Sequence, residues 1–130
     1  IYVNPSTNNV SIKQTTSSYS LDVNGSIRAS ADVIAYSDIR KKENIKTLEN
    51  SLEKVNQLRG VEFNKIGNNK KSIGVIAQEI EKILPEVVHT DDQGYKSVAY
   101  GNITALLIEA VKELQQKVEK LENKNCACKG

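Results

Sequence analysis

Apolar and polar residues alternate in short runs along residues 1–36, which is typical of β-strands. Residues 10–12, 21–23 and 27–31 alternate in this way, and Asn24-Gly25, a strong hairpin-turn signal, separates the second run from the third. Each run holds too few apolar residues to bury a face alone, so we expect these strands to intertwine with identical chains. The many Ser, Thr and Asn residues also suit an unstructured linker, and both interpretations stay open.

The apolar spacing becomes helical after residue 46. Intervals of four, three and three residues predict a helix that Thr47 caps and that ends at Arg59-Gly60. Its apolar stripe consists of Leu48, Leu52, Val55 and Leu58. Residues 61–63 then predict a strand, and Gly67 with the two asparagines after it predicts a turn.

The next segment combines a strand, a helix and a hairpin. An apolar strand near residues 72–76 runs into a helix that Pro85 ends. Residues 87–90 and 95–100 predict two strands, with a turn at residues 91–94 between them. Gln78 and Glu79 stand beside an apolar run, where we expect them to cap the helix and form ion pairs.

A heptad repeat marks the C-terminal part, where we expect a helix from Asn102 to about Asn123 and a coiled coil over residues 102–123. Its seam consists of Thr104, Leu107, Val111, Leu114, Val118 and Leu121. Branched residues at a with Leu at d favour two strands. The predicted fold class is therefore α+β, with a β-rich N-terminal segment, a small mixed body and a long C-terminal helix.

Composition limits the size of the core and the kinds of partner. The chain has 130 residues, which is enough for one domain or for one domain plus an extension. Because 38% of the residues are hydrophobic, with one Phe and no Trp, we expect a small core that depends on oligomerisation. Basic and acidic residues are interspersed at a net charge of +2, which gives no nucleic-acid face. No apolar run suits a membrane span. The absence of Met and the start at Ile1 suggest a piece excised from a longer polypeptide.

Neither a metal site nor a conventional hydrolase triad follows from the remaining reactive residues. Cys126 and Cys128 supply only two thiols in one chain, so we expect no metal site. Three chains brought together could pool six thiols, but a disordered, reduced tail is the simpler interpretation. His89 is the sole histidine and would have to serve any Ser-His-Asp triad, yet nothing around it resembles a nucleophile elbow. We expect no cofactor.

The stretch Ser-Asp-Ile-Arg-Lys-Lys-Glu-Asn-Ile at residues 37–45 stands where the chain changes character. Ser37 becomes a nucleophile if a base takes its hydroxyl proton, and Lys42 can be that base once it is neutral. A free lysine has a pKa near ~10.4, which burial or neighbouring cations such as Arg40 and Lys41 would lower. A charged solvated loop is the simpler interpretation of such a short pattern.

Three phrases resemble one family, the intramolecular chaperone auto-processing domain of phage endosialidases, tailspikes and tail fibres. They are residues 37–45, Gly-Val-Ile-Ala-Gln-Glu with Pro-Glu-Val-Val within residues 74–88, and Ala-Leu-Leu-Ile-Glu-Ala-Val-Lys-Glu-Leu at residues 105–114. Residues 21–30 also resemble the end of a phage fibre stalk. The resemblance implies a homotrimer with a parallel coiled coil, in conflict with the two strands that the seam residues favour.

The resemblance also implies that the chain consists of two parts with different functions. Residues 1–36 would end a fibre or spike stalk, and residues 37–130 would form a chaperone that registers three copies of that upstream stalk and then releases itself. Such a precursor would assemble in the host cytoplasm, with no nucleic-acid, membrane or small-molecule partner. The domain would be a single-turnover serine peptidase with a dyad of Ser37 and Lys42.

The bond that would break is less well defined. The resemblance points to Ser37-Asp38, but Ser37 attacking its own carbonyl would close a four-membered ring. Attack on the Tyr36 carbonyl would close a five-membered ring and cut Tyr36-Ser37. Arg40 is a candidate supporting residue, and Asn44 or a backbone N–H is a candidate oxyanion donor. A non-cleaving trimerisation tip of a fibre or adhesin is the main alternative, and a small binding domain that ends in a coiled coil is another.

Overall fold

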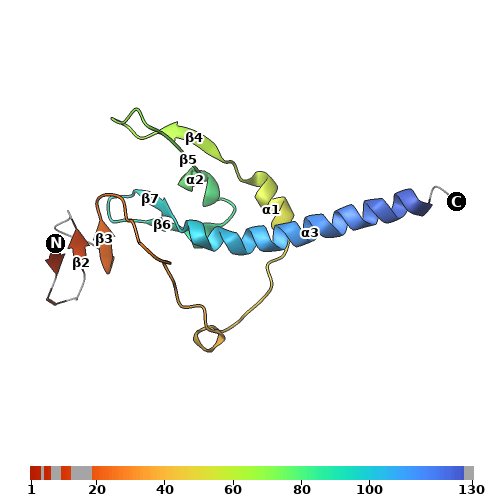
Figure 1. Ribbon diagram of the computed structural model, residues 1–130, viewed down its shortest axis with the longest axis horizontal. Coiled ribbons are helices and arrows are strands. Elements are labelled where there is room, and N and C mark those ends of the chain that lie inside the picture. Colours follow the sequence, from red (N-terminus) through yellow and green to blue (C-terminus); the bar gives the residue numbers. More distant parts are fainter. Residues whose placement is uncertain (4, 7–9, 13–18, 128–130) are drawn as a thin grey trace. The chain divides into compact units, whose positions relative to one another are not determined.

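The computed structural model describes residues 1–3, 5–6, 10–12 and 19–127 and divides into two compact units, Ile1–Ile45 and Lys46–Gly130 (Figure 1). The first unit holds a three-stranded sheet in the order β1-β2-β3. Its strands are β1 (Tyr2–Val3), β2 (Val10–Ile12) and β3 (Leu21–Val23), with β1 antiparallel and β3 parallel to β2. The 3₁₀ turn η1 (Ile39–Lys41) lies in the same unit.

The hairpin expected around Asn24-Gly25 is wrong. Residues 24–38 are all described and contain no strand, so 27–31 does not pair with β3. The Gly25 N–H instead closes a tight bend by donating to the Val23 carbonyl at 3.0 Å. Ile27 is 71% exposed, which explains the outcome: alternation without a surface to bury against does not stabilise a strand.

The second unit surrounds the first half of a long helix. Two antiparallel hairpins, β4-β5 and β6-β7, frame α2, and α1 packs on α3 (Figure 1). The elements are α1 (Ser51–Gln57), β4 (Val61–Asn64), β5 (Lys71–Gly74), α2 (Ala77–Ile80), η2 (Pro85–Val87), β6 (Val88–Thr90), β7 (Lys96–Val98) and α3 (Tyr100–Ala127).

A small apolar core holds this unit together. Ile80 of α2, Leu84, Val87 of η2 and Leu106 of α3 are buried against one another, with Val55 of α1 packed at the edge. Burying each such side chain contributes roughly 1.5–3 kcal/mol relative to leaving it in water. Residues of α1 and of the segment from α2 to η2 thus meet residues of α3 in one core, which makes this helix the scaffold of the unit.

The predicted cap of the first helix is wrong. Helix α1 begins at Ser51 rather than after Thr47, and its N-cap Asn50 has left-handed backbone (φ 55°) with no capping bond from its side chain. The Glu113 carboxylate of α3 accepts the N–H groups of Ser51 at 2.8 Å and Leu52 at 2.9 Å instead. A tertiary contact therefore supplies the acceptor that a local side chain usually provides at a helix N-terminus.

Three further helix boundaries also differ from expectation. Helix α2 ends at Ile80, before Pro85, which starts η2 rather than stopping α2. Helix α3 begins at Tyr100, so Asn102 does not cap it, and it continues to Ala127. No helix in the described part of the chain has a long enough apolar stretch to cross a membrane.

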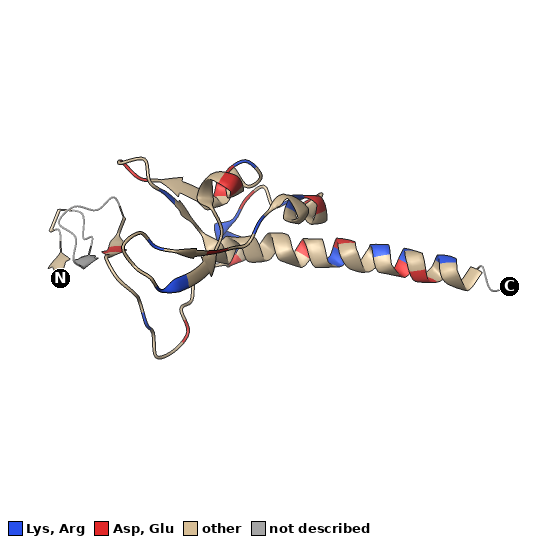
Figure 2. Cartoon of the chain, turned by 90° about the horizontal axis from the view of Figure 1, so that it is seen from above, with Lys and Arg blue, Asp and Glu red and all other residues tan. Residues whose placement is uncertain are grey.

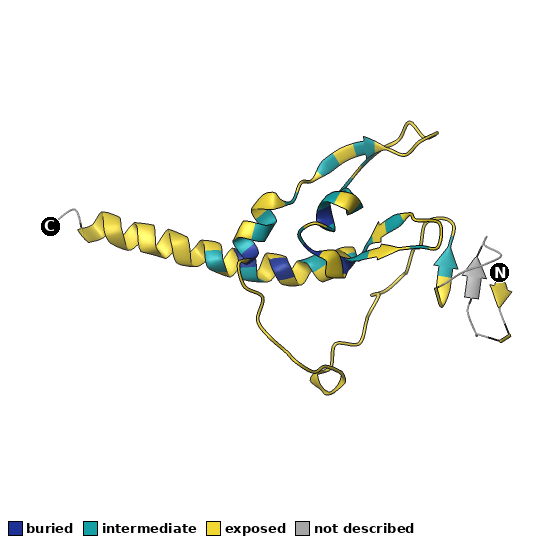
Figure 3. Cartoon of the chain, turned by 180° about the vertical axis from the view of Figure 1, so that it is seen from behind, coloured by how far each residue is buried: buried dark blue, intermediate teal, exposed yellow. Residues whose placement is uncertain are grey.

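Helix α3 is buried on one side of its N-terminal half and exposed over its C-terminal half. Leu106 and Ala110 are buried against the body, whereas residues 114–127 are exposed throughout (Figure 3). The exposed half carries the apolar residues Leu114, Val118 and Leu121 on a surface where acidic and basic residues otherwise alternate (Figure 2). The body therefore covers one side of α3 and leaves the heptad positions without cover in the single chain.

Candidate processing site

A short turn brings the two residues of the predicted dyad together. Asp38 is the N-cap of η1 and Lys42 is its C-cap, so the turn fills the space between Ser37 and Lys42. The backbone N–H groups of Lys41 and Lys42 donate to the carbonyls of Asp38 and Ile39 at 3.0 and 3.1 Å. The chain therefore folds back on itself immediately after Ser37.

The Lys42 ammonium group donates a hydrogen bond of 2.7 Å to the Ser37 hydroxyl. This length is in the range expected for a charge-assisted bond. The contact joins a nucleophile candidate to a base candidate within hydrogen-bond reach, which is the geometric condition for proton transfer between them. Both residues are exposed in the single chain.

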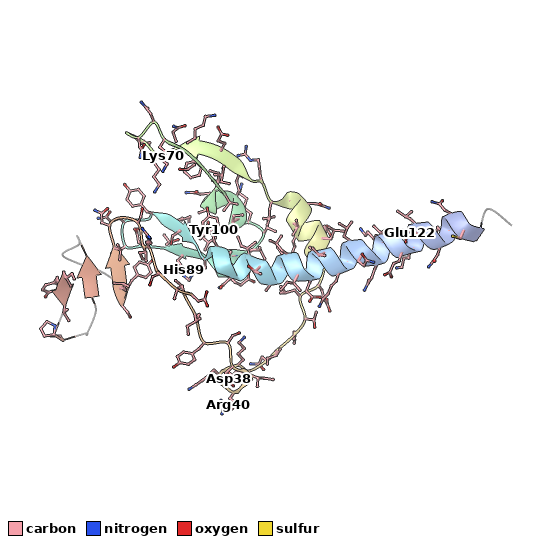
Figure 4. All side chains as sticks on the ribbon, viewed as in Figure 1. Asp38, Arg40, Lys70, His89, Tyr100 and Glu122 are labelled. Atoms are coloured by element: carbon pink, nitrogen blue, oxygen red, sulfur yellow. The ribbon has the colours of Figure 1, made fainter. Side chains whose placement is uncertain are left out.

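Arg40 turns toward Asp38. Its Nε and Nη2 atoms donate to the two Asp38 carboxylate oxygens at 3.0 and 2.7 Å, and its backbone N–H donates to the same carboxylate at 2.8 Å (Figure 4). The side-chain bond from Arg40, followed by the backbone bond, holds the pKa of Asp38 below its usual value. The same pair raises the pKa of Arg40. Sequence reasoning missed this function of Asp38, although an Asp directly before a turn is a recognisable cap signal.

The other predicted site residues lie in or beside this turn. Tyr36 is 98% exposed, and Lys41 lies within η1. Asn44 has left-handed backbone (φ 54°) two residues beyond Lys42. Among the described residues, no hydrogen bond links Asn44 to Ser37 or Lys42.

Glu113 is the other residue that sequence reasoning missed. The two backbone N–H groups that it accepts, Leu52 first and then Ser51, lower the pKa of its carboxyl, and Lys117 and Lys54 add smaller electrostatic contributions. The Ser51 side chain beside it is completely buried, with a hydroxyl that bonds to no group in the described chain. Glu113 lies 62 positions after Ser51 and 61 positions after Leu52. No local sequence pattern connects residues so far apart, so the sequence gives no signal for this contact.

The remaining candidates lie in the second unit. Glu79 accepts two bonds from Arg59, at 3.2 and 2.5 Å, and the side-chain bond from Arg59 lowers its pKa, in keeping with the pairing role that we expected. His89 is an exposed residue of β6 whose carbonyl accepts from Ser97. Cys126 is exposed, and Cys128 lies outside the described residues. The described residues contain no group of three metal-ligating side chains.

Comparison with known proteins places the turn at the start of a recognised domain. Residues 37–89 match the family model described as "Chaperone of endosialidase". The curated protein "Long tail fiber protein Gp37" of Enterobacteria phage K3 is 40% identical over 102 residues, which cover 72% of this chain and 8% of that protein. The Gp37 protein of Enterobacteria phage Ox2 is 35% identical over 102 residues, which cover 71% of this chain and 41% of that protein.

These findings define the class of the domain. The segment from Ser37 to His89 is a chaperone-of-endosialidase domain, which confirms the family that the sequence motifs indicated. Its relatives are long tail fibre proteins of phages, and this chain spans less than half the length of each relative reported above.

Proposed function

We propose that this chain is the C-terminal chaperone of a phage tail fibre or spike, which assembles three copies of its upstream stalk and then cuts itself free. One observation carries the proposal: the Lys42 amine lies 2.7 Å from the Ser37 hydroxyl at the first residue of the matched domain. The family model is named a peptidase, and the curated relatives are tail fibre proteins. The first name supports a processing step, and the second supports a role in a tail fibre.

Proton transfer from Ser37 to Lys42 would begin the cleavage. In the present contact Nζ donates to Oγ, as an ammonium group does. A neutral amine reverses the direction and accepts the hydroxyl proton, which leaves an oxygen nucleophile. The neutral form requires burial or a change in nearby charge, and packing of three chains around the exposed turn would supply burial. Cleavage would then follow assembly and act as a check on it.

Two scissile bonds remain open in this proposal. Attack of Ser37 Oγ on the Tyr36 carbonyl carbon would form an ester, break the Tyr36-Ser37 peptide bond and free the Ser37 amine. Water would then hydrolyse the ester to a carboxylate and restore the hydroxyl. For the Ser37-Asp38 bond, which the family resemblance favours, Ser37 would assist a water molecule or act on a neighbouring chain.

Trimerisation would occur along the exposed heptad face of α3. Residues 114–127 are all exposed in the single chain. A helical segment as short as this one has only marginal stability in water unless it packs against a partner. The apolar heptad positions of that stretch would become the seam of a parallel coiled coil. The homotrimer, the upstream stalk and release after cleavage are all parts of this proposal.

Purification of the whole chain with its upstream stalk tests the function directly. A self-cleaving chaperone gives two products on a denaturing gel, and N-terminal sequencing of the C-terminal product identifies the bond: it starts at Asp38 or at Ser37. Sedimentation should give the mass of three chains. A stable, uncut trimer would support the non-cleaving fibre tip instead, and an uncut monomer would contradict both.

A further inference from the structure

The dyad depends on a turn that is weak by itself. Ser37 and Lys42 are five residues apart, and an extended chain would separate them by about 17 Å, too far for their side chains to meet. The η1 turn removes this separation through two backbone hydrogen bonds of 3.0 and 3.1 Å. Since short 3₁₀ turns have poor hydrogen-bond geometry and low intrinsic stability, another interaction has to hold this one.

The Asp38 side chain is that interaction. Its carboxylate accepts the Arg40 backbone N–H as a cap and, at the same time, two guanidinium N–H groups of the same residue. Exposed ion pairs usually contribute little, but a two-pronged arginine–carboxylate pair with a further backbone bond is the favourable exception. Figure 4 shows Asp38 and Arg40 side by side in this turn.

We propose that Asp38 is a positioning residue for cleavage, whose carboxylate, acting with Arg40, holds the turn that keeps the Lys42 amine at the Ser37 hydroxyl. This inference rests on the proposed function. It gives Asp38 a role beyond contributing one side of the bond at Ser37-Asp38. In this proposal the guanidinium group of Arg40 pairs with the Asp38 carboxylate. The sequence alone instead suggests Arg40 as a cation that would lower the pKa of the lysine.

Cleavage rates of five variants test how the two residues act. Asp38→Asn keeps an acceptor for the Arg40 N–H but loses the charged two-pronged pair, so its rate should lie between those of the wild type and Asp38→Ala, which should be at least about fivefold slower. Arg40→Ala loses the same pair and keeps the cap, so its rate should match that of Asp38→Asn, and Arg40→Lys should be only partly restored because lysine lacks the two-pronged geometry. The double variant Asp38→Ala/Arg40→Ala should be no slower than Asp38→Ala. Glu49→Gln, an exposed change outside the turn, is the control with an unchanged rate.

Two kinetic outcomes would overturn the proposal. If Asp38→Asn were as inactive as Asp38→Ala while Arg40→Ala kept the wild-type rate, the carboxylate would be needed for proton transfer rather than for positioning. If the effects of the two alanine substitutions multiplied in the double variant, Asp38 and Arg40 would act independently. Because Arg40 lies outside the scissile bond, its variants separate positioning from an altered cleavage sequence.

A structural readout keeps the test independent of turnover. In the Ser37→Ala chain, which should stay uncut, NMR hydrogen exchange of the Lys41 and Lys42 amides reports the turn directly. Adding Asp38→Ala should speed this exchange, and Asp38→Asn, which keeps the cap alone, should speed it less. Exchange unchanged by Asp38→Ala would contradict the proposal. A wild-type chain that does not cleave would refute the proposed function, and the exchange result would still decide whether Asp38 holds the turn.

Discussion

Leu106 and Leu107 are neighbours on α3 with opposite surroundings. Leu106 is 1% exposed and belongs to the core with Ile80 and Val87, whereas Leu107 is 46% exposed and begins the apolar heptad face. One helix thus serves the fold of its own chain with one face and offers the other for association. Substitutions at these two leucines can therefore distinguish the stability of the folded single chain from the stability of the association between chains.

Truncating the two leucines should therefore have different consequences. Leu106→Ala leaves a cavity in the core and should lower the free energy of unfolding by about 2–5 kcal/mol, whatever the protein concentration. Leu107→Ala weakens association, so its effect on the unfolding midpoint should grow as the protein is diluted. Urea denaturation at two concentrations tenfold apart measures both. Equal concentration dependence for the two variants would contradict this division of the helix.

The heptad face should control assembly. Replacing Leu114 and Leu121 by Asp places charges in the proposed seam and should give monomers that no longer cleave. Gln116→Asp with Asn123→Asp is a matched control, because it adds the same charges at the same spacing on the opposite side of the repeat. Sedimentation equilibrium reports the outcome. A seam variant that remains trimeric would refute the assignment of the interface.

Glu113 should make the stability of the chain sensitive to acid. Its folded pKa is lowered, chiefly by the N–H groups of Leu52 and Ser51, so its contribution is fully present above the unfolded carboxyl pKa of about 4.3. That contribution is lost as the pH falls through the folded value. Glu113→Gln should therefore be less stable than the wild type at neutral pH, and the difference should shrink in acid. Thermal unfolding from pH 7 downward follows it.

Glu122→Gln provides the comparison for Glu113→Gln. It makes the same chemical change near the exposed end of α3, far along the helix from α1 (Figure 4). Its unfolding temperature should follow that of the wild type across the pH range. A constant deficit of Glu113→Gln at every pH would mean that shape rather than charge explains the Glu113 contact.

Gly74 allows a close contact with Tyr100. A Cβ atom at Gly74 would lie 2.6 Å from the Tyr100 hydroxyl and 3.3 Å from Phe63, and the same hydroxyl accepts the Val75 N–H. Gly74→Ala should cost roughly 1–3 kcal/mol through overpacking. Adding Tyr100→Phe removes the clashing oxygen, so the double variant should be more stable than Gly74→Ala alone. Chemical denaturation of the set measures the interaction, and purely additive losses would contradict the clash.

The sequence predicted elements well where the signal is local. The hairpin strands, the turn at Gly67 and the long helix with its repeat all follow from patterns within a few residues, and the structure contains them. The chemistry of Ser37 and Lys42 and the motif around them predict a dyad, and the turn between them brings their side chains into contact.

The failures have tertiary causes. Thr47 was a reasonable cap, but the acceptor at the start of α1 is Glu113, which is distant in sequence. The alternation at residues 27–31 has no surface to cover in one chain and forms no strand in this described segment. Pro85 does not end α2, because the helix already ends at Ile80, which is buried in the core with Leu84.

The central claim is that Ser37 and Lys42 form a catalytic dyad, and the intact mass of Lys42→Arg tests it most directly. Arginine keeps the positive charge but does not give up its proton in a protein, so an electrostatic role survives the change and a base does not. Purified trimers of wild type, Ser37→Ala, Lys42→Ala and Lys42→Arg are incubated and analysed by mass spectrometry. We expect fragments only from the wild type, with all three variants intact and trimeric. Full cleavage by Lys42→Arg would contradict the account and direct the search for the base to His89 or Glu79.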